Sequence, residues 1–293
     1  MEIFHISSAI AAFGYAVAAA VSKYALTKGA GVLRLAFVAN CLFVPTFAVP
    51  LIGNTNTIDW SLIVFPILTG VLFFLGQLFT FAAIRYGDVS LQTPIMGAKA
   101  VFVVFIAVLF GTETITLPLA FAAFASMFAV ACLGFSGGGA HRVGLTISLA
   151  LLSALFFAGS DVMMGHYGRA FGAAHFMFIA MLVNAALSFC LLPFFKSPLR
   201  VIPKVAWPWL LLASLLMAGQ ALLLNYTLVR YQSVAEVNVI YSMRGLWAVL
   251  IGVLFVKHLQ QVGEPINLKI IGLRFAGALL MCMALVILFY PYQ

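Results

Sequence analysis

Charged residues are scarce in this sequence. They make up 8% of its 293 residues, and only seven of them are acidic. A soluble domain usually carries about a quarter charged residues. In addition, a water-soluble fold could not bury the 65% of hydrophobic residues found here. The mean hydropathy is +1.17. The composition therefore excludes a water-soluble globular protein and predicts an integral membrane protein, with the lipid bilayer as its solvent.

Motifs for catalysis, ATP hydrolysis and metal binding are also missing. The sequence holds no phosphate-binding glycine loop and no nucleophile elbow, and its five histidines lack metal-ligand spacing. The four cysteines lie far apart in apolar surroundings, which favours buried side chains over a disulfide. The net charge is +8, but most of the basic residues lie singly in short loops and form no basic patch, so nucleic acid is not an expected partner. We expect no enzyme activity and no cofactor.

Long apolar runs fill the chain. Ten of them are long enough to cross about 30 Å of hydrocarbon as helices, and 293 residues leave no room for a separate soluble domain. The sequence therefore predicts an all-α membrane protein with ten transmembrane helices. The runs are Ile6–Leu26, Gly31–Ile52, Trp60–Ile84, Val89–Phe110, Thr116–Phe135, Val143–Met164, Ala173–Phe194, Trp207–Val229, Ala235–Val256 and Leu268–Tyr290.

The sequence also repeats itself at a distance of 145 positions. Arg85–Phe110 aligns with Arg230–Phe255, and this register places Lys99 on Arg244, a mid-span cation on a mid-span cation. Matching aliphatic residues are common among membrane helices, whereas matching cations are not. The register predicts two five-helix repeats, residues 1–138 and 139–293, within one membrane domain.

Because five is an odd number, the second repeat is expected to be inverted in the membrane. Inverted repeats are typical of secondary transporters, whose substrate site lies near mid-membrane between the halves. The distribution of basic residues then places the odd-to-even connections in the cytoplasm and both termini outside. One side carries Lys23, Lys28, Arg34, Arg85, Arg142, Lys196, Arg200, Lys204, Lys257, Lys269 and Arg274, and the other carries Arg169 and Arg230.

Lys99 and Arg244 are the strongest candidates for a substrate site. An ionisable group in the membrane interior costs at least about 2.5–3.5 kcal/mol, so it needs a functional or structural reason. Two cations in one cavity of low dielectric constant repel each other unless an anion lies between them. An anionic substrate would supply that charge. Alternatively, Asp161 and Glu236 serve as protein partners of these cations, or as carriers of a coupling proton.

Other polar residues on the same spans add hydrogen-bonding capacity. Each alone is more often a contact between helices than a ligand contact, but together they could line one interface. Gln92 shares a helical face with Lys99, and Tyr241 and Trp247 lie three positions either side of Arg244. The predicted substrate-binding set is Lys99, Arg244, Gln92, Tyr241, Trp247, Asn238, Gln77 and Asn225.

The stretch AIRYGDVSLQTPIMGAKAVFVVFIAVLFGTETIT, Ala83–Thr116, resembles the drug/metabolite transporter superfamily in its ten-helix, EamA-like form. Members typically show an alanine–glycine segment, a proline-bearing fourth helix and a Gly-x-Glu-like end, here Gly111-Thr112-Glu113. The second half reads Val256-Lys257-His258 at the equivalent place and lacks the acidic residue. The resemblance implies a multi-pass transporter, most similar to those of the bacterial inner membrane, with both termini in the cytoplasm.

The plastid phosphate translocators of this superfamily bind phosphate with basic residues on their fourth and ninth helices. Lys99 and Arg244 match those helices, so the resemblance also favours an anionic substrate. We therefore expect a secondary active or facilitative transporter of a small organic anion or zwitterion, working by alternating access as a monomer or homodimer. The alternatives are a non-transporting scaffold or accessory subunit, which would pair both cations with carboxylates, and a lipid flippase.

Overall fold

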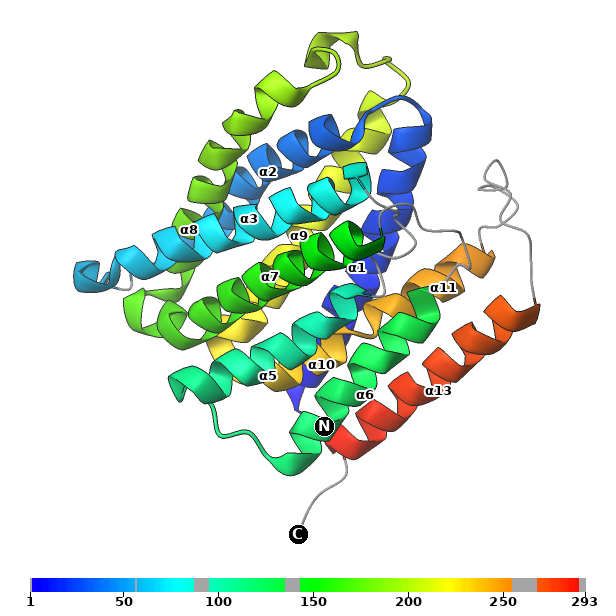
Figure 1. The fold of residues 1–293 in the computed structure, drawn as a ribbon. Helices are drawn as coiled ribbons and strands as arrows, with labels where there is room; N and C mark the ends of the chain where they lie inside the picture. Colours follow the sequence, from blue (N-terminus) through cyan, green and yellow to red (C-terminus); the bar gives the residue numbers. More distant parts are fainter. Residues whose placement is uncertain (1, 56, 87–94, 135–142, 255–267, 290–293) are drawn as a thin grey trace.

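The computed structural model describes residues 2–55, 57–86, 95–134, 143–254 and 268–289. Every regular element within these ranges is a helix, so the all-α prediction is confirmed for them (Figure 1). The α-helices are α1 (Ile3–Thr27), α2 (Val32–Ala48), α3 (Val64–Tyr86), α5 (Lys99–Phe110), α6 (Leu117–Gly134), α7 (Val143–Phe171), α8 (Ala173–Ser188), α9 (Trp207–Tyr231), α10 (Val234–Tyr241), α11 (Arg244–Leu254) and α13 (Leu268–Phe289). The 3₁₀ helices are η1 (Val49–Leu51), η2 (Trp60–Leu62), η3 (Met96–Ala98), η4 (Phe189–Phe194) and η5 (Leu199–Val201).

Many of these helices have the length and composition of membrane spans. Within the described residues, six helical segments are long and apolar enough to cross a bilayer, and three shorter apolar helices accompany them. The six are Ile3–Thr27, Val32–Leu51, Trp60–Ala83, Gly144–Phe171, Ala173–Phe194 and Trp207–Tyr231, and the three are Met96–Phe110, Leu117–Leu133 and Phe275–Leu288. The chain is therefore a multi-pass membrane protein, and the total of ten spans stays a prediction.

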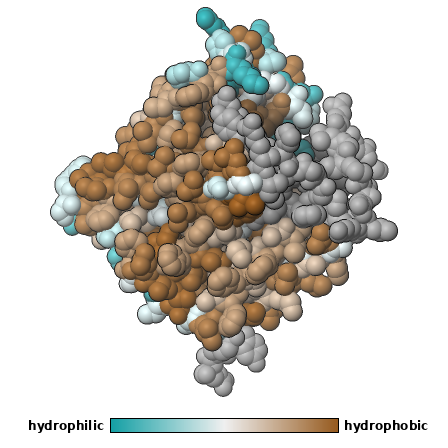
Figure 2. Space-filling model, viewed as in Figure 1, coloured by the Kyte–Doolittle hydropathy of each residue, from teal (hydrophilic) through white to brown (hydrophobic). Residues whose placement is uncertain are grey.

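Large apolar side chains face outward, as expected for a protein in lipid. Phe105, Phe121 and Phe275 are each about three-fifths exposed or more, whereas the buried residues of α1 are mostly alanines. Figure 2 shows an apolar surface across the face in view, with hydrophilic residues over the α8–α9 connection at the top. Since lipid tails solvate the large side chains, small ones are free to pack the interior and let the helices approach closely.

Helix contacts interleave the two halves of the chain. The most extensive pairs are α3 with α7, α1 with α9 and α6 with α13, and each pair joins one helix of the first half to one of the second. The contacts also come in corresponding pairs. If α1, α3 and α5 correspond to α7, α9 and α10–α11, then α5–α7 has its counterpart in α11–α1, and both pairs are in contact. The halves thus form one body around a shared centre.

Gly277 of α13 marks the close approach of α13 to α6. A Cβ atom at this position would lie 2.8 Å from the backbone oxygen of Ala129 and 2.8 Å from the backbone nitrogen of Leu133. Backbone atoms cannot move aside as a flexible side chain does. We expect Gly277→Ala to lower the free energy of unfolding in detergent by about 1–3 kcal/mol.

Gly272 on the same helix provides the matched control, because its Cβ would meet nothing within 4 Å. Gly272→Ala should leave stability unchanged or raise it by up to about 1 kcal/mol through helix propensity. Equal effects of the two substitutions on thermal unfolding would contradict the α6–α13 packing.

Candidate functional site

Two helix interruptions precede the two central cations. The 3₁₀ helix η3 runs directly into α5, which begins at Lys99, and a turn at Ser242–Met243 separates α10 from α11, which begins at Arg244. The prediction of one continuous helix over Ala235–Val256 is therefore wrong at this turn. Both interruptions end immediately before a cation, and the two cations are 145 positions apart.

The hydrogen-bond pattern changes at the second interruption. The Ser242 N–H and hydroxyl both donate to the Asn238 carbonyl, at 3.1 and 2.9 Å. The following amides bond over a shorter separation: Met243 donates to the Ile240 carbonyl at 3.0 Å and Gly245 to the Ser242 carbonyl at 3.1 Å. Bonds between residues three apart define a 3₁₀ turn. The turn thus interrupts the α-helical ladder of the ninth span just before Arg244.

Lys99 and Asp161 form a buried ion pair between α5 and α7. The Lys99 Nζ atom lies 2.7 Å from Asp161 Oδ2, and the two side chains are only 9% and 6% exposed. The sequence does not decide whether Asp161 pairs with Lys99 or with Arg244. In the structure it pairs with Lys99. At this depth the loss of hydration is costly for both ions, so each depends on the other for its charged state.

Arg244 lies against two tyrosine rings, which pack edge-on against each other with their centres 6.1 Å apart. Its Cζ atom is 4.9 Å from the centre of the Tyr15 ring of α1 and 4.8 Å from the centre of the Tyr241 ring of α10. Within the described residues Arg244 makes no ion pair with a carboxylate. A desolvated cation–π contact contributes about 2 kcal/mol, so the rings hold the guanidinium without neutralising it.

Tyr241 connects the two cations. Lys99 Nζ lies 5.7 Å from the centre of the same Tyr241 ring that contacts Arg244, and 6.0 Å from the Phe157 ring of α7. The Tyr241 hydroxyl donates to Gln220 Oε1 of α9 at 2.9 Å. The centre therefore brings together two cations, one carboxylate and an aromatic wall, drawn from both halves of the chain, with a net charge of +1.

Several predicted site residues lie in other contacts. Gln77 exchanges two hydrogen bonds with Asn40, at 2.8 and 3.0 Å, which joins α3 to α2. Asn238 donates to the Val234 carbonyl of its own helix. Asn225 Nδ2 and Trp247 Nε1 are buried and have no hydrogen-bond partner within the described residues. Gln92 lies outside the described residues.

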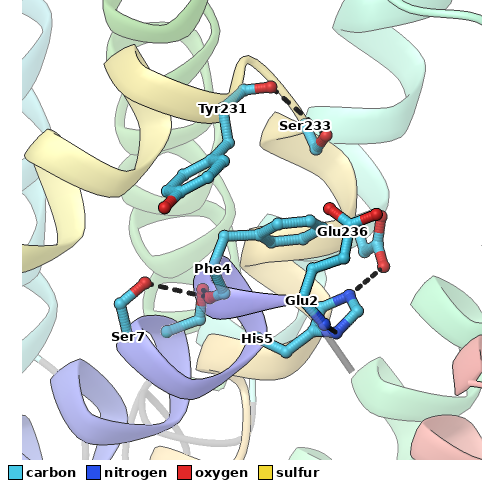
Figure 3. A network of polar contacts seen from close by, with 8 residues as sticks. Glu2, Phe4, His5, Ser7, Tyr231, Ser233 and Glu236 are labelled. Atoms are coloured by element: carbon cyan, nitrogen blue, oxygen red, sulfur yellow. Dashed lines mark hydrogen bonds and ion pairs between the residues drawn. The ribbon is translucent and has the colours of Figure 1, made fainter.

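Glu236 contacts the start of α1 and not Arg244. His5 Nε2 lies 2.7 Å from Glu236 Oε1, and the backbone N–H of Glu2 donates to His5 Nδ1 at 3.0 Å (Figure 3). Because Nδ1 accepts a hydrogen bond, the ring proton is on Nε2 and is donated to Glu236. Phe4 packs between His5 and Tyr231 in the same network.

Glu113 of the Gly111-Thr112-Glu113 motif holds the N-terminus of α10. Its two carboxylate oxygens accept hydrogen bonds from the backbone N–H groups of Val234 and Ala235. These are orphan donors of the first helical turn, and a negative charge there is favoured by the helix dipole. Glu113 and Glu236 thus tie α10 to the first half of the chain and fix the helix that leads to Arg244.

Burial raises the pKa of Glu113 above its ordinary value of 4.5; the hydrogen bonds from Val234 and Ala235 oppose this rise, and the charge of Glu236 adds to it. Glu113 also lines a small cavity of about 250 Å³ together with His166 and Gln232. Among the residues that the structure describes, no group of three His, Cys, Asp or Glu side chains is placed to bind a metal ion.

The roles of two residues around the central cations, Tyr15 and Glu113, are not evident from the sequence. Tyr15 lies in an apolar run with no distinguishing neighbours, and its contact with Arg244 joins residues over two hundred positions apart. In the sequence, Glu113 stands out only as the last residue of the Gly111-Thr112-Glu113 motif. Its role as a cap on α10 depends on tertiary structure. The Gly-x-Glu ending, which the second half lacks, was the available signal for Glu113.

A helical membrane protein with an uncompensated cation at its centre has the features of a solute transporter. The chain belongs to the EamA-like transporter family, whose model matches residues 144–290. It is thus a membrane transporter of the drug/metabolite kind, and members of this family are transporters rather than enzymes.

Comparison with solved structures supports the same fold. A crystal structure titled only "Crystal structure of protein" is similar over 98% of this chain and 98% of its own, with a TM-score of 0.72 and 16% sequence identity. No curated protein matches the chain significantly. At this identity the similarity shows the fold and says nothing about the substrate.

The Lys99–Asp161 pair predicts a large coupling between the two positions. Asp161→Asn leaves a buried ammonium group without a counter-charge and should lower the free energy of unfolding by about 3–5 kcal/mol. Lys99→Gln combined with Asp161→Asn removes both charges and should recover most of this loss. Thermal unfolding in detergent measures both.

Asp59→Asn is the matched control, because it removes an exposed carboxylate from a connection between helices and should change stability by no more than about 1–2 kcal/mol. If the double variant is as unstable as Asp161→Asn alone, the two side chains do not depend on each other.

Glu113 predicts a pH dependence of stability. Its pKa is raised in the folded protein, so the folded state holds this proton more tightly than the unfolded state does. The stability it contributes is therefore greatest below pH 4.5 and is lost as the pH rises through the raised pKa. Relative to Glu113→Gln, the wild-type protein should become progressively less stable as the pH increases above that value.

Thermal unfolding of the two proteins over a pH series measures this difference. The two proteins differ at this one side chain, so the difference between their stability curves is assigned to Glu113. Parallel stability curves would show that Glu113 has the same pKa in the folded and unfolded states.

Proposed function

We propose that this protein is a secondary transporter of a small organic anion or zwitterion, such as a phosphorylated or carboxylated metabolite or an amino acid. Arg244 is its principal substrate-binding residue, and Lys99 and Tyr241 complete the site. It works by alternating access between two inverted five-helix repeats, residues 1–138 and 139–293, as a ten-helix protein of the bacterial cytoplasmic membrane.

The charge balance at the centre carries this proposal. Asp161 pairs with Lys99 at 2.7 Å, so Arg244 keeps a positive charge that lies against two tyrosine rings and has no carboxylate partner among the described residues. An anion that binds Arg244 would neutralise the centre, and the planar guanidinium offers two parallel N–H donors to a carboxylate or phosphate. The Tyr241 ring lies against both cations, so the bound anion would have Lys99 within its electrostatic reach.

The same geometry accommodates a zwitterion. Its anionic group would bind Arg244, while its ammonium group would lie toward Asp161, which carries the one carboxylate at the centre. This arrangement separates the two charges of the ligand onto α11 and α7, two different helices of the second half of the chain. The scaffold alternative predicts a carboxylate partner for each cation, and the described residues provide one for Lys99 alone.

Corresponding contacts support the alternating-access mechanism. α5 packs on α7 as α11 packs on α1, and α3 packs on α7 as α9 packs on α1. Such pairs of equivalent interfaces allow one half to rock against the other by exchanging similar contacts. In this mechanism, α5 and α10–α11 would carry both cations near the axis of that motion. His5 and Glu113 would then act as contacts that close one face of the protein.

A thermal-shift screen of the purified protein tests the substrate class. It compares organic phosphates, carboxylates, amino acids, nucleosides and organic cations on the wild type, Arg244→Gln and Arg244→Lys. A ligand present at a hundred times its Kd stabilises the folded state by about 2.7 kcal/mol. We expect anions or zwitterions to stabilise the wild type, Arg244→Gln to abolish the shift, and Arg244→Lys to retain part of it.

Arg200→Gln is the matched control, since it removes an exposed arginine from the α8–α9 connection and should leave the ligand shift intact. Stabilisation by cations or neutral solutes alone, or an undiminished anion shift in Arg244→Gln, would overturn the proposed substrate class.

A further inference from the structure

A second cavity lies away from the central site, at the face of the protein where α7 and α9 end. Its volume is about 420 Å³. The walls come from four segments: the α2–α3 connection, the last turn of α7, the start of α8 and the last turns of α9. The lining residues that matter here are Thr57, Arg169, Gly172, Tyr226 and Arg230.

Two arginines from neighbouring helices share this cavity. Arg169 lies in the last turn of α7 and Arg230 in the last turn of α9. They are also the two basic residues that the sequence assigns to this side of the membrane, and the fold brings both to one place. Within the described residues neither has an ion pair or a hydrogen bond to its guanidinium.

Helix dipoles explain only part of this arrangement. A cation near a helix C-terminus is stabilised by about 0.3–1 kcal/mol, which accounts for an arginine in each last turn. Both arginines are exposed and solvated, but two like charges beside one cavity still form a local excess of positive charge that the dipoles do not balance. An anion bound in the cavity would be attracted to both guanidinium groups and would reduce the repulsion between them.

The other lining groups also suit an anion. Tyr226 precedes Arg230 by one turn of α9 and is 49% exposed, so its hydroxyl is available as a donor. Thr57 adds a second hydroxyl, and none of the described residues that line the cavity is a carboxylate. Gly172 has a φ of +115°, and a Cβ there would lie 3.3 Å from the Thr57 carbonyl oxygen, so a side chain would both strain and fill this wall.

The position of the cavity indicates the source of the anion. Trp60 is 62% exposed and packs edge-on against Phe171, whose chain neighbours Ala170 and Gly172 line the cavity. Tryptophan favours the level of the lipid headgroups. α7 and α9 are long apolar helices that end at this same level. A lipid phosphate would therefore come within reach of both arginines.

We propose that this cavity binds a phosphate group, held by Arg169 and Arg230 together with Tyr226. An anionic phospholipid headgroup and a soluble phosphate share this chemistry, and the location favours the lipid. The site is separate from Arg244, and this inference does not depend on the substrate proposed for the central site.

Binding is tested by thermal shift of the protein in detergent, titrated with phosphatidylglycerol, phosphatidylcholine or inorganic phosphate. The variants are Arg169→Gln/Arg230→Gln and the charge-retaining Arg169→Lys/Arg230→Lys. Arg200→Gln/Lys204→Gln is the matched control, because it removes two exposed cations from the α8–α9 connection. Each titration is repeated in an Arg244→Gln background, which separates phosphate bound here from phosphate bound at the centre.

We expect phosphatidylglycerol to raise the unfolding temperature of the wild type and of Arg244→Gln, and phosphatidylcholine to have a smaller effect. The Gln pair should lose most of this shift, the Lys pair should keep part of it, and the control should keep all of it. If inorganic phosphate gives the same dependence on Arg169 and Arg230 and the lipid adds nothing, the site takes a soluble anion. Equal shifts in the wild type and the Gln pair would overturn the proposal.

Discussion

The central constraint on this protein is that charge inside a membrane must be compensated. Lys99 and Asp161 compensate each other at 2.7 Å, in a contact between α5 and α7 that is almost closed to solvent. Among the described residues, Arg244 has no carboxylate partner and lies against the rings of Tyr15 and Tyr241. Because the two cations contact one tyrosine ring, the centre carries one excess positive charge. In the proposed transport mechanism, substrate selection and the coupling of the two halves both follow from this imbalance.

The surrounding fold holds Lys99, Asp161 and Arg244 in position. α5 begins at Lys99, directly after the 3₁₀ helix η3, and α11 begins at Arg244, directly after the turn at Ser242–Met243. Both charged side chains therefore lie at helix starts within the bundle. Glu113 and the His5–Glu236 contact anchor α10 from the first half of the chain. The buried alanines of α1 allow the helices to approach closely, while phenylalanines cover the lipid-facing surface. Charge is thus confined to a few places where the fold gives it a partner or a task.

The sequence predicted the broad outcome well, because hydropathy depends on composition and needs no tertiary information. The all-helical membrane class, the apolar spans and the proximity of Lys99 and Arg244 could all be read from the chain. The break before Arg244 could not, since the change to 3₁₀ hydrogen bonding at Ser242–Met243 lies inside an apolar run of full span length. The Tyr15 contact and the pairing of Glu236 with His5 also escaped prediction, because both join helices that are distant in sequence. Gln77 looked like a ligand contact, yet its amide is used by Asn40.

The most direct measurement is an experimental structure of the protein with a stabilising anion bound. We predict density for the anion against the Arg244 guanidinium, bordered by the Tyr15 and Tyr241 rings, with the Lys99–Asp161 pair alongside. An anion bound elsewhere, with Arg244 instead paired to a carboxylate of the chain, would show that this arginine is structural and that the substrate site lies in another part of the protein.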